Sequence, residues 1–522
     1  MKYYITTPIY YVNDTPHIGH AYTTIAADVI ARWHRLKGDD VFFLTGTDEH
    51  GAKIAQAAAK AGITPQQLCD RNSAEFKAAW QDLSITYDDY IRTTEPRHEE
   101  AVKQFLQVLF DKGLIFKRKY EGLYCVPCEK YLSSQDLNED MCCPDHKQKP
   151  VVHAEENYFF KLSQFRMQLL EILTDEKHPQ HCAIYPVERR NEIVGKLKAM
   201  PLEDISISRS SLAWGIPLPF DPSQTAYVWV DALLNYITAP GYNASLPCQD
   251  NPERFRKYWP CDVHLMAKDI LWFHSVIWPA LLLGAGLPLP KRVFAHGFFT
   301  INGDKMSKTL GNVIHPKELI GKFGIDASRY LVLSLFPFGT DGDISWAALT
   351  EKYNVDLANN VGNLAARTLT MLEKYAEGRV PELQPAHGVK DIFPQIDEGL
   401  NSAEKHLEEL DFYRFTGALQ NAVTLANRYI EEHAPWKMAK EANPALPSVL
   451  YHLIANVKII TLFLTPLMPA VSAELWKQLG ETEPVDAAAR RYFSSKEKSL
   501  IAPRPGTMTA KGGILFPRIL SK

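Results

Sequence analysis

Two short motifs, far apart in the chain, constrain its fold more than any other feature. The first, His17-Ile-Gly-His20, follows an apolar run and opens a helical pattern, and the second, Lys305-Met-Ser-Lys-Thr309, follows a turn that contains Gly303. A glycine at a helix start lets the backbone approach a phosphate closely, and imidazole or ammonium groups near the positive helix end favour its charge. The two motifs together predict a nucleotide site assembled from distant parts of the chain.

The first hundred residues alternate strand-like and helical patterns. Tyr3–Tyr11 and Asp40–Thr45 are predicted strands, and between them the apolar residues of segment 19–37 recur every four residues, as in a helix that ends at Gly38. Such alternation predicts an α/β fold with a doubly wound parallel sheet, in which ligands bind at the carboxyl ends of strands. The polar residues expected at those ends are His17, His20, Asp48 and His50.

This alternation stops near residue 116 and resumes later. Thr225–Val230, His264–Met266 and Val293–His296 are predicted strands that continue the sheet, and strand patterns are absent after Trp346. We therefore expect a catalytic domain in two halves, an insertion between them, a connective domain with the second motif, and a helical bundle. The expected boundaries are 1–115 and 223–290 for the two halves, 116–222 for the insertion, 291–345 for the connective domain and 346–522 for the bundle and its tail.

The insertion contains two closely spaced pairs of metal-binding residue types. Cys125 and Cys128 form one pair, and Cys143 and His146 form another with the same spacing. Two such pairs can hold a tetrahedral Zn²⁺, and four protein ligands leave no open position, so a structural zinc ion is predicted. Cys142 is the alternative to Cys143 as a ligand, and a set of free thiols is the alternative to a metal site.

Composition limits the remaining classes of protein. The chain has 522 residues, 46% of them hydrophobic and 23% charged, as in soluble globular proteins. The net charge of −4 means that an RNA ligand would need local basic patches. The cysteine spacing is not that of a disulfide scaffold and no targeting segment is recognised, so we expect a cytoplasmic protein. The longest apolar stretch, Val449–Val471, contains polar residues and prolines, which predicts a buried helix and a break rather than a membrane span.

With these motifs the chain resembles the class I aminoacyl-tRNA synthetases, and nearly its whole length is similar to methionyl-tRNA synthetases. The runs that carry the resemblance are Thr7-Pro-Ile-Tyr-Tyr-Val-Asn13, Gly46-Thr-Asp-Glu-His-Gly51, Tyr227-Val-Trp-Val-Asp-Ala232, Lys268-Asp269, Phe273-His274, Trp278-Pro279 and Ala434-Pro-Trp436. The resemblance implies a class I Rossmann-type catalytic domain with a zinc-binding insertion, followed by an α-helical anticodon-binding bundle. The chain departs from the family at Thr309, where serine is usual, and at Ala267, where glycine is usual.

The resemblance also implies residue roles in the catalytic domain. Methionine would contact Ile9, Tyr11, Asp48, Trp229, Ala232, Leu233, Tyr236, His274 and Trp278, and ATP would contact His17, Gly19, His20, Asp269, Lys305 and Lys308. Catalysis would involve His17, His20, Lys305, Lys308, Asp48 and Arg209, with Asp48 receiving the substrate ammonium and Arg209 pairing with Asp48 or with the reaction's charges. Aromatic walls also suit an unbranched, polarizable thioether on physical grounds.

The helical part carries a polar stripe. Asn359, Asn363 and Arg367 recur every four residues opposite an apolar face. A guanidinium can read unpaired bases and a tryptophan can stack on them, although a solvated helix face and a core tryptophan would show the same pattern. The resemblance implies that Asn363, Arg367 and Trp436 contact the anticodon.

The implied activity is activation of L-methionine with ATP and Mg²⁺ to methionyl-adenylate, and transfer of the methionyl group to the terminal adenosine of tRNA(Met), including the initiator. Positioning and charge stabilisation would accomplish most of the catalysis. A monomer is expected, because no appended tRNA-binding module follows the bundle. No membrane partner is expected. Two alternatives stay open: a class I ligase for another amino acid such as cysteine, which would place zinc in the substrate pocket, and a non-catalytic RNA-binding protein with this fold.

Overall fold

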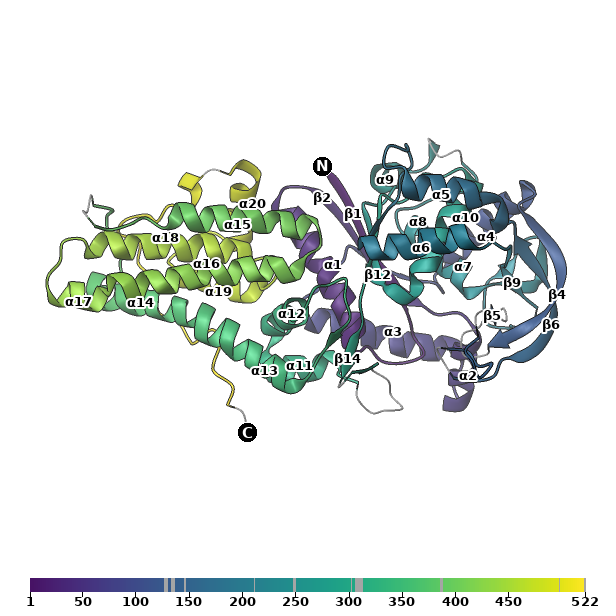
Figure 1. Ribbon diagram of the computed structural model, residues 1–522, viewed down its shortest axis with the longest axis horizontal. Helices are drawn as coiled ribbons and strands as arrows, with labels where there is room; N and C mark the ends of the chain where they lie inside the picture. Colours follow the sequence, from purple (N-terminus) through teal and green to yellow (C-terminus); the bar gives the residue numbers. More distant parts are fainter. Residues whose placement is uncertain are drawn as a thin grey trace.

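The computed structural model describes residues 1–125, 130–132, 137–144, 147–210, 212–246, 250–301, 303–305, 313–384, 388–496 and 498–520. An α/β catalytic part and a helical bundle lie at opposite ends of an elongated molecule (Figure 1). This division confirms the α/β catalytic fold and the helical bundle predicted from sequence. The four domain boundaries stay predictions.

A six-stranded parallel sheet forms the centre of the catalytic part. Its strands, in their order across the sheet, are β3 (Asp89–Arg92), β2 (Asp40–Asp48), β1 (Lys2–Tyr11), β12 (Val263–Ala267), β13 (Arg292–His296) and β7 (Ala183–Tyr185). The chain order reverses between β1 and β12, and ligands of doubly wound sheets bind at the carboxyl ends of the strands beside such a reversal.

Helices cover both faces of this sheet because neighbouring side chains of a strand point to opposite sides. Tyr3 and Ile5 of β1 belong to the hydrophobic cluster beneath α1 and α3, whereas Tyr4 belongs to the cluster beneath α4 and α10. The helices of the catalytic part are α1 (Ile18–Leu36), α2 (Ala52–Ala61), α3 (Pro65–Asp82), α4 (Pro96–Asp111), α5 (Arg166–Thr174), α6 (Val187–Ala199), α7 (Val228–Leu233), α8 (Asn235–Thr238), α9 (Glu253–Tyr258) and α10 (Trp278–Ala285).

Two small antiparallel sheets occupy the region predicted as an insertion. One contains β5 (Lys130–Leu132), β4 (Ile115–Cys125), β6 (Val151–Phe160) and β8 (Ile205–Ser206), and the other contains β10 (Pro217–Leu218), β11 (Asp221–Ala226) and β9 (Ser208–Arg209). One strand from the same part of the sequence, β7, pairs with β13 at the edge of the catalytic sheet.

The prediction of a sheet strand at Thr225–Val230 was wrong. Its first residues end β11 in an antiparallel sheet, and Val228 begins helix α7. Valine and tryptophan favour strands locally, but their propensity is weaker than the tertiary packing that places this turn of helix in the hydrophobic cluster beneath α4 and α10. The strands predicted at His264–Met266 and Val293–His296 are confirmed as β12 and β13.

A short connective region leads into the bundle. It contains the sheet β15 (Asp304–Lys305), β14 (Phe299–Ile301) and β16 (Gly342–Asp343) and the helices α11 (Pro316–Phe323) and α12 (Ile325–Ser334). The helical elements that follow are α13 (Trp346–Lys352), η7 (Tyr353–Gly362), α14 (Asn363–Ala376), α15 (Phe393–Glu408), α16 (Phe412–His433), α17 (Pro435–Lys440), α18 (Leu446–Leu464), α19 (Pro469–Gln478) and α20 (Val485–Ser495). The apolar helix α18 is long enough to cross a membrane, but 78% of its most apolar window is buried inside the molecule.

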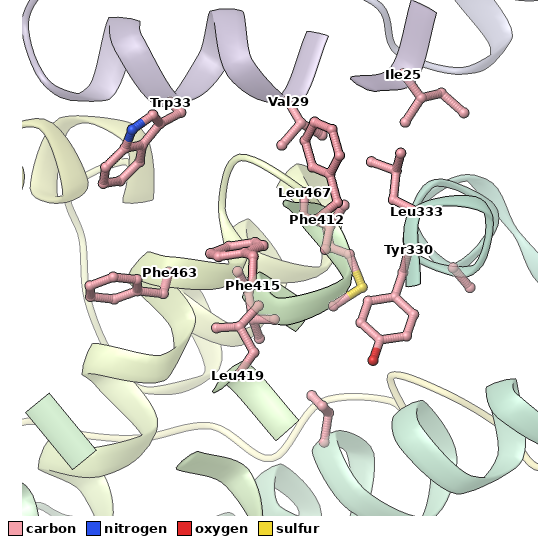
Figure 2. Packing of buried hydrophobic residues seen from close by; sticks show 14 of the residues in the cluster. Ile25, Val29, Trp33, Tyr330, Leu333, Phe412, Phe415, Leu419, Phe463 and Leu467 are labelled. Atoms are coloured by element: carbon pink, nitrogen blue, oxygen red, sulfur yellow. The ribbon is translucent and has the colours of Figure 1, made fainter. Parts of the chain in front are cut away.

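Helix α1 joins the two parts of the molecule. Figure 2 shows Ile25, Val29 and Trp33 of this helix facing buried side chains of α12, α16 and α18. Beside them Asp28 forms a fully buried ion pair with Arg329, at 2.7 Å. The helix whose first turn carries the His17–His20 motif is therefore fixed at its other end by the bundle.

Candidate active site

A cavity of about 430 Å³ opens at the carboxyl ends of the central strands. It is lined by residues at the ends of β1, β2, β12 and β13 and by the first turn of α1. This is the position that the order reversal between β1 and β12 predicts for a ligand.

The first motif forms the N-terminus of α1 at one side of this cavity. His17 is the N-cap residue, and its Nδ1 accepts a hydrogen bond from the backbone N–H of Gly19 at 3.0 Å. Nδ1 of His20 accepts from the backbone N–H of His17 at 3.2 Å, and the two imidazole rings stack at 3.8 Å. An imidazole nitrogen that accepts a hydrogen bond carries no proton, so each neutral ring carries its proton on Nε2.

Both motif histidines are neutral at physiological pH. Burial, together with the nearby His315, lowers the pKa of His17 to about 4. Burial, together with the neighbouring His17, lowers the pKa of His20 well below its ordinary value. These residues can therefore donate N–H groups to a phosphate beside the positive end of α1, but they do not bring formal charges.

The other side of the cavity combines an acid with aromatic and aliphatic walls. Tyr11 and Asp48 lie opposite each other in the pairing of β1 with β2, and Asp48 is only 8% exposed. Trp229 stacks on Phe273 with ring centroids 4.2 Å apart. Of the residues predicted to bind methionine, those that line the cavity are Ile9, Tyr11, Asp48, Trp229, Ala232, Leu233, Tyr236 and His274.

Hydrogen bonds fix the orientation of the innermost rings. His274 Nδ1 donates to the carbonyl of Ile270 at 2.9 Å, so its Nε2 accepts from the Tyr236 hydroxyl at 2.8 Å. Burial lowers the pKa of His274 to about 4, so this wall is uncharged. Trp278 is fully buried behind Tyr236 rather than among the lining residues, and its Nε1 donates to Nε2 of His264 at 3.2 Å.

Four predicted residues of the nucleotide site, His17, Gly19, His20 and Asp269, line the same cavity. Asp269 is exposed and lies in the short helical turn Lys268–Ile270 that directly follows β12. Lys308 and the side chain of Lys305 lie outside the described residues, so their roles stay predictions.

The structure places Arg209 apart from the lining residues of this cavity. Its guanidinium lies 4.2 Å from the ring centroid of Tyr227 and donates to the carbonyl of Ser208 at 2.7 Å. Its pairing with Asp48 or with the reacting groups stays a prediction.

Other lining residues were not predicted from sequence. They include Thr23, Lys53, Asn235 and His296. Two of them had a usable signal, because His296 ends a predicted strand and Lys53 lies two residues after the Gly46–Gly51 run. His296 Nδ1 donates a hydrogen bond to the carbonyl of Gly297, so Nε2 of the neutral ring carries no proton. Nε2 therefore accepts from the Thr23 hydroxyl at 2.6 Å.

The predicted zinc ligands lie away from the cavity. Cys125 and Cys143 are each 1% exposed and pack in one small cluster with Leu132. Cys128 and His146 lie outside the described residues, and within those residues no group of three or more side chains is placed to hold a metal. Neither Cys125 nor Cys143 lines the cavity, which argues against the cysteine-specific alternative.

The residues predicted to contact an anticodon lie on one surface of the bundle. The Arg367 guanidinium lies 5.8 Å from the Trp436 ring centroid and pairs with Glu431 at 2.7 Å. Trp436 is 41% exposed, and Asn363 is exposed one turn before Arg367 on α14. The apolar face of the same helix is buried, as predicted.

Comparison with known proteins identifies the family. The family model described as tRNA synthetases class I (M) matches residues 3–149 and 128–369, and that of the anticodon-binding domain of tRNA ligase matches residues 390–507. The chain is 44% identical to the methionine–tRNA ligase of Caldanaerobacter subterraneus subsp. tengcongensis, covering 99% of this chain and 79% of the relative. It is 43% identical to the methionine–tRNA ligase of Streptomyces coelicolor, covering 100% of this chain and 97% of the relative.

Solved structures agree with these sequence matches. Mycobacterium tuberculosis methionyl-tRNA synthetase in complex with methionyl-adenylate is similar with a TM-score of 0.91 and 38% identity, covering 99% of this chain and 100% of that one. The apo form of the same enzyme is similar with a TM-score of 0.85 and 34% identity, covering 100% of this chain and 99% of that one. Together, the fold, the family models and the relatives show that the chain belongs to the methionyl-tRNA synthetases, the class I methionine–tRNA ligases.

Proposed function

We propose that this chain joins L-methionine to the terminal adenosine of tRNA(Met), initiator included, through a methionyl-adenylate. The observation that carries the proposal is one cavity with two chemically different sides. The first motif lines one side, and Asp48 with the aromatic and aliphatic wall lines the other. Such a cavity can hold a nucleotide phosphate next to a small zwitterion with an apolar side chain.

In the first step, a carboxylate oxygen of methionine attacks the α-phosphorus of ATP and pyrophosphate leaves with the bonding electrons. Asp48, buried at the end of β2, accepts the substrate ammonium. The side chain enters between Trp229, Tyr236 and His274, where an uncharged aromatic wall favours a polarizable thioether over a charged or branched side chain.

On the nucleotide side, the neutral Nε2–H groups of His17 and His20 donate to phosphate oxygens as charge shifts in the transition state. Lys305 and Lys308 would contact the departing pyrophosphate, and Asp269 would accept from the ribose hydroxyls. A bound Mg²⁺ would neutralise phosphate charge next to these groups. The protein's contribution is mainly orientation and preorganised donors.

In the second step, a hydroxyl of the terminal adenosine attacks the acyl carbon and AMP leaves. The matching tRNA would be selected at the far end of the bundle, where Arg367 and Trp436 form an exposed cation–aromatic pair beside Asn363. Stacking on tryptophan suits an unpaired anticodon base.

We also propose a structural zinc ion held by Cys125, Cys128, Cys143 and His146. The burial of Cys125 and Cys143 in a shared cluster supports this ligand set over one with Cys142. Cys142 is only half-buried, and its Sγ contacts the carbonyl of Asp140 at 3.6 Å. A cytoplasmic monomer completes the proposal, and light scattering on the purified chain tests its monomeric state.

A charging assay tests the proposal. The chain should attach labelled methionine to a tRNA(Met) transcript with a CAU anticodon, and much less to the same transcript with a changed anticodon. Asp48→Asn should lose charging activity on both transcripts. Adenylate formation without any transfer to tRNA would contradict the ligase activity, and equal charging of both transcripts would contradict the anticodon surface.

A further inference from the structure

Charge is distributed unevenly around the cavity. The Gly46–Gly51 run carries Asp48 and leads directly into α2, whose first turn carries Lys53. The Lys53 Nζ lies 5.8 Å from the ring centroid of Tyr11, the residue opposite Asp48 in the sheet. Asp48, Lys53 and Tyr11 therefore meet at one corner of the cavity.

Lys53 is the source of positive charge at this corner. Within the described part of the chain, it is the only lysine or arginine that lines the cavity. The lining histidines do not replace it, because burial lowers the pKa of His17, His20, His274 and His296. The substrates of the proposed function are anionic at the carboxylate and the phosphates, so each of these groups needs a cationic or N–H partner.

We propose that Lys53 binds the α-carboxylate of methionine while Asp48 binds the α-ammonium. The inference deepens the proposed function and depends on it. Both charged groups of an amino acid are attached to one carbon, so their partners must lie close together. Asp48 at the end of β2 and Lys53 in the first turn of α2 meet this requirement. Lys53 is half-buried and its Nζ lies over the Tyr11 ring, which limits the paths open to its ammonium group.

The assignment adds a function to adenylate formation. Lys53 would hold one carboxylate oxygen and leave the other free to form its bond with the α-phosphorus, as the bond to pyrophosphate breaks. The pyrophosphate carries away the electron pair, and the former carboxylate becomes the acyl group of an anhydride. Lys53 would then lie beside the acyl and phosphate oxygens of that anhydride.

Calorimetric titration with methionine and with methioninol, the analogue whose carboxylate is a hydroxymethyl group, tests the assignment. Lys53→Gln should weaken methionine binding by about ten-fold or more, because a charge-assisted hydrogen bond is lost. It should weaken methioninol binding by less than about two-fold, because that compound has no carboxylate to lose. Lys60→Gln, an exposed lysine in the last turn of the same helix, is the matched control and should bind both compounds like the parent.

Other outcomes overturn the inference in distinct ways. Equal losses for both compounds would mean a structural role, and a raised KM for ATP with unchanged methionine affinity would mean a phosphate partner. If Lys53→Gln does not fold, Lys53→Arg should keep the affinity for methionine within about three-fold, because arginine retains the positive charge. Lys53→Met should lose that affinity, because methionine is uncharged at this position. A parent chain that binds neither compound overturns the proposed function as well, whereas normal methionine binding by Lys53→Gln overturns this inference alone.

Discussion

Replacing Asp231 should weaken both the catalytic domain and the methionine side of the cavity. This residue lies on α7 and is 1% exposed. Its carboxylate accepts from His50 Nδ1 at 2.7 Å and from His98 Nε2 at 2.8 Å. His50 follows Asp48 by two residues, and α7 also carries Trp229. The two hydrogen bonds therefore hold one wall of the cavity against the end of β2.

The size of the effect follows from burial. Removing one partner of a buried charged pair typically costs about 3–5 kcal/mol, which is the loss of unfolding free energy that we expect for Asp231→Ala. Asp231→Asn keeps the volume and one acceptor oxygen, so only one buried histidine N–H loses its partner, at a cost of about 1–3 kcal/mol.

The effect should also depend on pH. Burial alone would lower the pKa of His50, but the charge and hydrogen bond of Asp231 outweigh burial and raise it above 6.5. The folded state therefore gains stability from a protonated His50 below pH 6.5 and loses it as the pH rises through the raised pKa. For Asp231, burial is outweighed by His50 and His98, so its pKa lies below 3.8 and its contribution is lost only as the pH falls through that lowered value.

Calorimetric unfolding at pH 6 and pH 9, with KM for methionine and for ATP, measures these effects. Asp231→Asn should lower the midpoint temperature for unfolding of the catalytic part more at pH 6 than at pH 9. It should also raise KM for methionine more than KM for ATP. Asp111→Asn changes an exposed carboxylate at the end of α4, the helix that carries His98, and should have almost no effect. Parent-like stability and KM in Asp231→Asn at pH 6 would refute the reasoning.

Three further predictions concern the remaining proposed sites. Lys308→Ala should slow adenylate formation by about 10²–10³ in rapid-quench experiments with little change in ATP affinity, and an unchanged rate would exclude a transition-state role. Cys125→Ser should release about one equivalent of Zn²⁺ in metal analysis, whereas Cys142→Ser should retain it, and the reverse pattern would reassign the ligand. Trp436→Ala should lower kcat/KM for charging by about ten-fold or more, since base stacking contributes about 1–3 kcal/mol, and a parallel fall in pyrophosphate exchange would mark Trp436 as structural.

Local sequence signals predicted the elements around the first motif well. The strand at Tyr3–Tyr11 and the helix ending near Gly38 are confirmed as β1 and α1, because period, glycine position and apolar content agree there. The prediction of a strand at Thr225–Val230 was wrong because its β-branched and aromatic residues lie in a buried helical turn. That turn is stabilised by neighbours distant in sequence.

The site shows the same limit. Residues in motifs could be assigned to the cavity because the carboxyl ends of parallel strands meet at one edge of a sheet. For Lys53 and His296 the sequence signal was only their proximity to a motif and to a predicted strand. Whether their side chains enter the cavity depends on how α2 and β13 turn. Trp278 likewise donates a hydrogen bond to His264 rather than lining the cavity, a position that depends on tertiary packing.

The most direct test of the central claim is ATP–pyrophosphate exchange with each of the twenty amino acids in turn. A cavity with an acid for the ammonium and an uncharged aromatic wall predicts rapid exchange with methionine and far slower exchange with every other amino acid. Faster exchange with cysteine or with any other amino acid would contradict the assigned specificity, and exchange with none of them would contradict the enzymatic activity itself.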